Sequence, residues 1–121
     1  MRILIIEDDP AIAANLYDYF EAKGHFADTA ADGVSGLHLA VTGGFDVIVL
    51  DLGLPDTDGW EVARRLKASP RTAAVPIIAL TGASLPHERV SAMRAGCDRY
   101  LIKPCRPPDL LQAIRQCLEK E

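Results

Sequence analysis

Long hydrophobic runs are missing from this chain, and no stretch approaches the roughly 18 apolar residues that a membrane-spanning helix requires. The short apolar run near the N-terminus leads into three acids, a pattern that does not fit a secretory signal peptide. Cysteine is scarce: Cys97, Cys105 and Cys117 form no Cys-x-x-Cys pair, which argues against a disulfide framework or a zinc site. We therefore expect a cytoplasmic protein with reduced thiols and no membrane contact.

An excess of positive charge is missing as well. The chain has 13 Lys and Arg against 17 Asp and Glu, with a pI near 5.3, which does not support direct nucleic-acid binding. The basic residues of the second half are scattered along predicted helices, so we expect them to form a solvated surface. The chain has 121 residues, of which 49% are hydrophobic. This length and composition predict that residues 1–121 form one domain with a substantial core.

Short apolar runs alternate five times with helical patterns along the chain. The runs predict strands at residues 2–6, 25–29, 46–50, 77–80 and 99–102. The segments after them predict helices at residues 10–23, 33–43, 60–67, 84–95 and 107–118. Strand–helix alternation with right-handed crossovers predicts the α/β class, with a doubly wound parallel sheet in a (βα)5 arrangement.

Four of the five predicted strands are followed by residues of complementary chemistry. Glu7 and Asp8 follow the first strand, Asp51 the third, Thr81 the fourth and Lys103 the fifth. Because parallel strands end at one edge of a sheet, we expect these side chains to meet there. Crowded carboxylates repel one another unless a cation lies between them, and oxygen ligands suit Mg²⁺. An acidic nucleophile, a metal, a lysine and a hydroxyl are the groups that phosphoryl transfer needs.

Each of these residues alone also fits a purely structural role. Glu7 and Asp8 could be loop acids, Asp51 a solvated carboxylate, Thr81 a strand-end hydroxyl and Lys103 a surface lysine. The coincidence at four strand ends favours a functional site. Residues 56–59 (DTDG) lack the full spacing of a calcium-binding EF-hand loop and its final glutamate, and we interpret them as a turn and helix cap.

Four segments together resemble a known family. Residues 3–10 (ILIIEDDP), 51–59 (DLGLPDTDG), 80–82 (LTG) and 103–104 (KP) are similar to the hallmark segments of the receiver domain of bacterial two-component response regulators, in particular single-domain chemotaxis-type regulators. The resemblance covers essentially the whole chain. It implies a flavodoxin-like fold with a five-stranded parallel sheet in the order 2-1-3-4-5.

The resemblance also implies a phosphoacceptor and a metal site. Asp51 would receive a phosphoryl group from a sensor histidine kinase, a histidine phosphotransfer protein or a small phosphodonor, forming 4-aspartylphosphate. Mg²⁺ would be bound directly by Asp8 and Asp51, by the backbone carbonyl of Gly53, and by Glu7 through water. The chain would not be an enzyme beyond this self-phosphorylation and its own dephosphorylation.

Further residues would relay the signal in such a receiver. Lys103 would contact a phosphoryl oxygen, or Asp51 before phosphorylation, and its bond to Pro104 would be cis. Thr81 would move to the phosphoryl group and Tyr100 would rotate inward behind it, although Tyr100 also fits the role of an edge-strand aromatic. A downstream protein effector would bind the fourth helix, fifth strand and fifth helix, roughly residues 84–118. The protein would be a monomer or weak dimer.

Alternatives remain for the context and the class of the protein. We expect a stand-alone receiver acting by protein contact; the alternative is a receiver module of a longer transcriptional regulator or hybrid kinase. A Mg²⁺-dependent toprim-like phosphoryl or nucleotidyl enzyme would need Asp-x-Asp, which the segment Asp51-Leu52-Gly53 lacks. An FMN binder would need a hydroxyl- and glycine-rich phosphate loop where the first acids lie.

Overall fold

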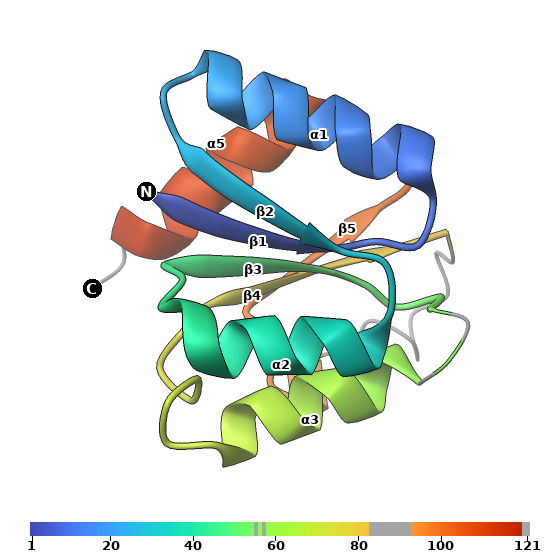
Figure 1. Ribbon diagram of the computed structural model, residues 1–121, viewed down its shortest axis with the longest axis vertical. Helices are drawn as coiled ribbons and strands as arrows, with labels where there is room; N and C mark the ends of the chain where they lie inside the picture. The colour runs from blue at the N-terminus through green and yellow to red at the C-terminus, as the bar shows by residue number, and fades with distance from the viewer. Residues whose placement is uncertain (55, 57, 83–92, 120–121) are drawn as a thin grey trace.

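The chain forms a parallel sheet between two layers of helices (Figure 1). The computed structural model describes residues 1–54, 56, 58–82 and 93–119. The strands are β1 (Arg2–Ile6), β2 (Phe26–Ala30), β3 (Val47–Asp51), β4 (Ile77–Thr81) and β5 (Arg99–Ile102); the helices are α1 (Pro10–Ala22), α2 (Gly33–Gly43), α3 (Gly59–Ala68) and α5 (Pro107–Glu119). All strand pairs are parallel and the order is β2-β1-β3-β4-β5, which confirms the predicted fold class and topology.

Several element ends differ by one residue from the sequence prediction. The strands β3 and β4 include Asp51 and Thr81, because these residues pair with Leu80 and Ile102 in the neighbouring strands. Backbone pairing therefore continues one residue past the apolar run. Most of the helix predicted over residues 84–95 lies outside the described residues; Met93 and Arg94 are helical, and Gly96 follows with φ +104°. That φ is typical of the glycine that ends a helix.

The central strands are buried on both faces. Along β1, Leu4 and Ile6 pack into the core shared with α2 and α3, whereas Ile3 and Ile5 pack into the core beneath α1 and α5. Figure 1 shows these two helix pairs on opposite sides of the sheet. Since every residue of β3 is buried, the backbone that carries Asp51 is enclosed on both faces and held by both neighbouring strands.

Acidic side chains begin the three N-terminal helices. Asp9, Asp32 and Asp58 are the N-cap residues of α1, α2 and α3, and their carboxylates accept backbone N–H groups from the first turn. The turn and helix cap predicted at residues 56–59 are thus partly confirmed, since Asp58 caps α3 through the N–H of Trp60. None of the helices in the described part of the chain has the length and apolar character needed to span a bilayer.

The hydrophobic pattern of α2 shows only part of its buried face, since Leu37 and Leu39 pack against the core but are only partly buried. Gly36 and Ala40 lie against the sheet, while Val34 is 68% exposed. A Cβ on Gly36 would lie 2.6 Å from Cδ1 of Ile6, so the small residue permits close packing of α2 on β1. Small residues contribute little to an apolar stripe, and the exposed valine adds a misleading signal.

Candidate functional site

Three acids meet at the carboxyl edge of the sheet. Glu7 follows β1, and its N–H donates to the carbonyl oxygen of Ala30 at 2.9 Å, which fixes its backbone beside β2. Glu7, Asp8 and Asp51 each place a carboxylate oxygen within 4.8 Å of the others. Glu7 and Asp51 are 3% and 5% exposed, whereas Asp8 is exposed. The structure therefore brings together the three acids predicted to hold a metal ion.

Lys103 reaches this acidic cluster from the end of β5. Its Nζ lies 2.8 Å from Oε1 of Glu7 and 3.3 Å from Oδ1 of Asp51. Its backbone N–H donates to the carbonyl oxygen of Thr81 at 2.7 Å, and the Lys103–Pro104 peptide bond is cis, as expected. The expected contact with Asp51 is present, but the shorter contact is with Glu7. One ammonium group thus bridges the two buried carboxylates.

The electrostatics of the cluster follow from this shared burial. Burial and a hydrogen bond with Asp51 raise the pKa of Glu7 from 4.5 to about 7, against the lowering effect of Lys103. Burial also acts to raise the pKa of Asp51, but hydrogen bonds with Glu7 and the Gly53 N–H outweigh it and lower that pKa. Burial acts to lower the pKa of Lys103, but its two carboxylate partners, Glu7 and Asp51, outweigh burial and raise that pKa. In this cluster the proton is therefore held by Glu7 up to about pH 7, while Asp51 is ionised and Lys103 is charged.

The donor set fits a hard divalent cation. Three carboxylates supply the oxygen ligands that Mg²⁺ prefers, and a cation would replace the proton that Glu7 holds. A hollow of about 600 Å³ borders Glu7 and Asp8 and is otherwise lined by residues of α1 and by the end of β2 with Ala31. Solvent and small solutes can therefore reach the acidic cluster. The chemistry available is cation binding beside a buried, ionised carboxylate.

The segment after Asp51 is held against the same carboxylate. The N–H of Gly53 donates to Oδ1 of Asp51 at 3.0 Å, and the N–H of Leu52 donates to the carbonyl oxygen of Leu80 at 3.0 Å. Gly59, the first residue of α3, packs directly on Leu52, where an added Cβ would lie 2.5 Å from Cα. Backbone therefore meets backbone at this contact, with no flexible side chain to yield.

We expect Gly59→Ala to lower the free energy of unfolding by about 1–3 kcal/mol, because its methyl group must displace the Leu52 backbone. Urea unfolding of the two proteins measures the difference. Gly82→Ala is the control, since a Cβ there meets no atom of the described residues within 4 Å, and it should change stability by less than about 0.5 kcal/mol. Equal stability of Gly59→Ala and the wild type would contradict the close contact.

The other two predicted residues lie on β4 and β5. Thr81 is buried at the end of β4, at the same edge of the sheet as Asp51. Tyr100, in β5, pairs with Ala79 of β4 and is half-buried against the core shared with α2 and α3. Both the strand-end position of Thr81 and the edge-strand position of Tyr100 match the sequence predictions; their switching roles stay predictions.

The sequence did not predict one contact in this region, that of Asp56 with α2. Asp56 was expected only in a turn before α3, yet its carboxylate accepts the N–H groups of Gly33 and Val34 at 2.8 and 3.2 Å. These amides belong to the first turn of α2. No local pattern could reveal the contact, because the partners are 23 and 22 positions earlier in the chain.

Comparison with known proteins agrees with the resemblance to receiver domains seen in the sequence. The response regulator receiver domain family matches residues 3–115. The transcriptional regulatory protein CusR of Escherichia coli K12 is 36% identical over 120 residues, covering 99% of this chain and 52% of CusR. The chain spans about half the length of the curated relatives it matches.

Solved structures agree in fold and in the nature of the site. A CheY-like receiver domain protein from Methanospirillum hungatei superposes with a TM-score of 0.91 at 31% identity, over 98% of this chain and 94% of that one. The receiver domain of the sensor histidine kinase PA1611 from Pseudomonas aeruginosa, which has a magnesium ion in its active-site cleft, superposes at 0.86 and 30% identity, over 95% and 94%. This chain belongs to the response regulator receiver domain family of two-component signalling.

Proposed function

We propose that residues 1–121 act as one cytoplasmic receiver domain that takes a phosphoryl group onto Asp51 in a Mg²⁺-dependent reaction. The donor is the phosphohistidine of a sensor histidine kinase or histidine phosphotransfer protein. The observation that carries the proposal is the position of Asp51: a buried carboxylate of lowered pKa, within reach of two further acids and of the Lys103 ammonium. Such a carboxylate is ionised and ready to attack phosphorus.

The contacts of Asp51 define the proposed transfer. The Gly53 N–H and the Lys103 ammonium both contact Oδ1, so they orient the carboxylate, and Oδ2 forms the bond to phosphorus. The phosphorus–nitrogen bond of the donor breaks, its electron pair returns to the imidazole, and an acyl phosphate remains. Asp8, Asp51 and the Gly53 carbonyl directly, with Glu7 through water, would hold Mg²⁺, which neutralises charge on the transferred oxygens when bound.

The product then changes the contacts around it. Phosphorylation adds about 1.5 to 2 negative charges at Asp51. Lys103 contacts a phosphoryl oxygen, the Thr81 hydroxyl donates a hydrogen bond to another, and Tyr100 rotates inward from β5. These movements alter the surface formed by β5 and α5, which controls a partner protein; residues 84–92, the remainder of the expected effector surface, lie outside the described residues. The domain acts as a monomer or weak dimer.

A second candidate is favoured by the relatives. CusR is a transcriptional regulatory protein about twice as long as the matched segment. In that context the same phosphorylation switch controls a linked output domain and not a separate protein. Phosphorylation at Asp51 is common to both candidates, as is the absence of direct DNA contact by the receiver itself.

Incubation with acetyl phosphate, with and without Mg²⁺, followed by intact mass measurement tests the proposal. The wild type should gain one phosphoryl group only when Mg²⁺ is present, and Asp51→Asn should gain none. Asp109→Asn, which changes an exposed acid in the first turn of α5, should behave like the wild type. A wild type that gains no phosphoryl group from acetyl phosphate or from a phosphorylated histidine protein would refute the proposal.

A further inference from the structure

The N-terminal end of α2 is bound by two different acids. The N-cap residue Asp32 accepts the N–H of Ser35 at 2.7 Å. The N–H groups of Gly33 and Val34 instead go to Oδ1 and Oδ2 of Asp56, at 2.8 and 3.2 Å. Three N–H groups that the helix itself leaves unpaired are therefore satisfied, two of them by a residue from another part of the chain.

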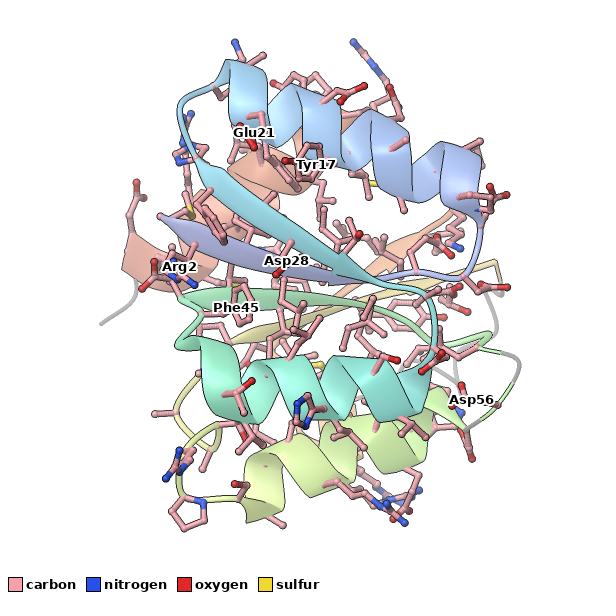
Figure 2. All side chains as sticks on the ribbon, in the orientation of Figure 1. Arg2, Tyr17, Glu21, Asp28, Phe45 and Asp56 are labelled. Atoms are coloured by element: carbon pink, nitrogen blue, oxygen red, sulfur yellow. The ribbon has the colours of Figure 1, made fainter. Side chains whose placement is uncertain are left out.

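This arrangement differs from the starts of the neighbouring helices. Asp9 accepts the N–H groups of Ala11 and Ile12 at the start of α1, and Asp58 accepts that of Trp60 at the start of α3. Those caps are local. At α2 the carboxylate of Asp56 adds a favourable charge at the positive end of the helix dipole and ties two segments together. Figure 2 shows Asp56 on the segment between β3 and α3, beside the N-terminal end of α2.

The segment that Asp56 anchors begins at the acidic cluster. Leu52 is fixed by its hydrogen bond to Leu80 and by the packing of Gly59, and Leu54 is buried. Between these residues, Gly53 is exposed and donates its N–H to Asp51. The path of the chain at Gly53 therefore depends on how the segment is held on both sides, and Asp56 holds it to α2.

We propose that Asp56 is a positioning residue for the phosphoryl-transfer site. By binding two amides of α2, it anchors the connection between β3 and α3, so that Gly53 presents its N–H to Asp51 and its carbonyl to the cation. This role rests on the proposed function. Asp56 also couples the first turn of α2 to the state of Asp51. A change that stabilises the contact of Asp56 with α2 also stabilises the contact of the Gly53 N–H with Asp51, and the reverse holds as well.

Asp32→Ala is the matched control for Asp56→Ala. Both variants remove a carboxylate from the same helix end and should lower the thermal midpoint by similar amounts. Only Asp56→Ala removes the anchor between α2 and the connection from β3 to α3. In the metal-free protein it should therefore raise hydrogen exchange of the Gly53 N–H about tenfold, the scale of losing one or two hydrogen bonds, while Asp32→Ala leaves that exchange unchanged.

Two functional measurements complete the test. Mg²⁺ titration followed by fluorescence of Trp60, the single tryptophan, should show affinity about tenfold weaker in Asp56→Ala and unchanged in Asp32→Ala. The rate of phosphorylation by acetyl phosphate should fall in Asp56→Ala and stay unchanged in Asp32→Ala. Asp56→Asn should have an intermediate rate, because its amide keeps one acceptor oxygen.

The outcomes separate this proposal from the proposed function. A wild type that binds Mg²⁺ and is phosphorylated, together with equal Gly53 exchange and equal Mg²⁺ affinity in the two alanine variants, overturns the positioning role alone. A wild type that neither binds Mg²⁺ nor is phosphorylated overturns the proposed function and, with it, the role assigned to Asp56. Faster Gly53 exchange and weaker Mg²⁺ binding in Asp56→Ala alone support the proposal.

Discussion

Lys103→Ala is expected to slow phosphorylation of Asp51 about a hundred- to a thousandfold and, at the same time, to strengthen Mg²⁺ binding. The rate falls because the ammonium group that lies 3.3 Å from Oδ1 of Asp51 would stabilise charge on the phosphoryl oxygens during transfer. The affinity for Mg²⁺ rises because, in the wild type, the Lys103 ammonium contacts oxygens of Asp51 and Glu7 and repels the incoming Mg²⁺. Acetyl phosphate kinetics and Mg²⁺ titration measure the two effects.

Lys67 provides the matched control for this variant. Its side chain is 23% exposed, against 24% for Lys103, and it also pairs with a carboxylate, that of Asp98 at 3.2 Å. Lys67→Ala should therefore cost comparable stability but leave both the phosphorylation rate and the Mg²⁺ affinity unchanged. A Lys103→Ala protein phosphorylated as fast as the wild type, or one with weaker Mg²⁺ binding, would contradict the bridging role of Lys103.

The fold was predictable where burial is strongest. The apolar runs of β1, β3 and β4 are buried on both faces, so their sequence signal does not depend on which face is inside. The helix starts were predictable from Asp9-Pro10 and Asp32-Gly33, since capping is a local interaction. The packing of α2 was not, because Gly36 serves as a contact surface by lacking a side chain.

The site was predictable to the level of which residues meet, and no further. Parallel strands carry their terminal residues to one edge, which placed Glu7, Asp51 and Lys103 together before any contact was known. The shorter contact of Lys103 with Glu7 depends on side-chain reach across the edge of the sheet. The bond between Asp56 and α2 depends on the path of a connecting segment. Neither is encoded in a local pattern, because each partner is distant in sequence.

Glu7 is expected to make the metal-free protein less stable as the pH rises from about 5 to 7. Its pKa is about 7 in the folded chain against 4.5 as its ordinary value, so the folded state retains a proton that the unfolded state releases. Stability falls with pH wherever the folded state binds more protons. A shift of this size corresponds to at most about 3 kcal/mol. The lowered pKa of Asp51 acts in the opposite direction, but below pH 3.8 and outside this window.

Glu7→Gln isolates this effect, because glutamine resembles the protonated side chain and cannot titrate. The difference in unfolding free energy between wild type and Glu7→Gln should be constant below about pH 4.5 and should fall, to the disadvantage of the wild type, as the pH approaches 7. Urea unfolding at a series of pH values in EDTA gives this difference, and Glu119→Gln, at an exposed position of α5, should show no such trend.

Saturating Mg²⁺ should reverse the pH dependence, so that the wild type becomes more stable as the pH rises. The reason is that the cation competes with the proton of Glu7, and the stabilisation by bound Mg²⁺ therefore grows with pH. In Glu7→Gln the gain from Mg²⁺ should be smaller and nearly independent of pH. A difference that stays flat from pH 4.5 to 7 would mean that Glu7 is already ionised beside Lys103, and would contradict the raised pKa of Glu7.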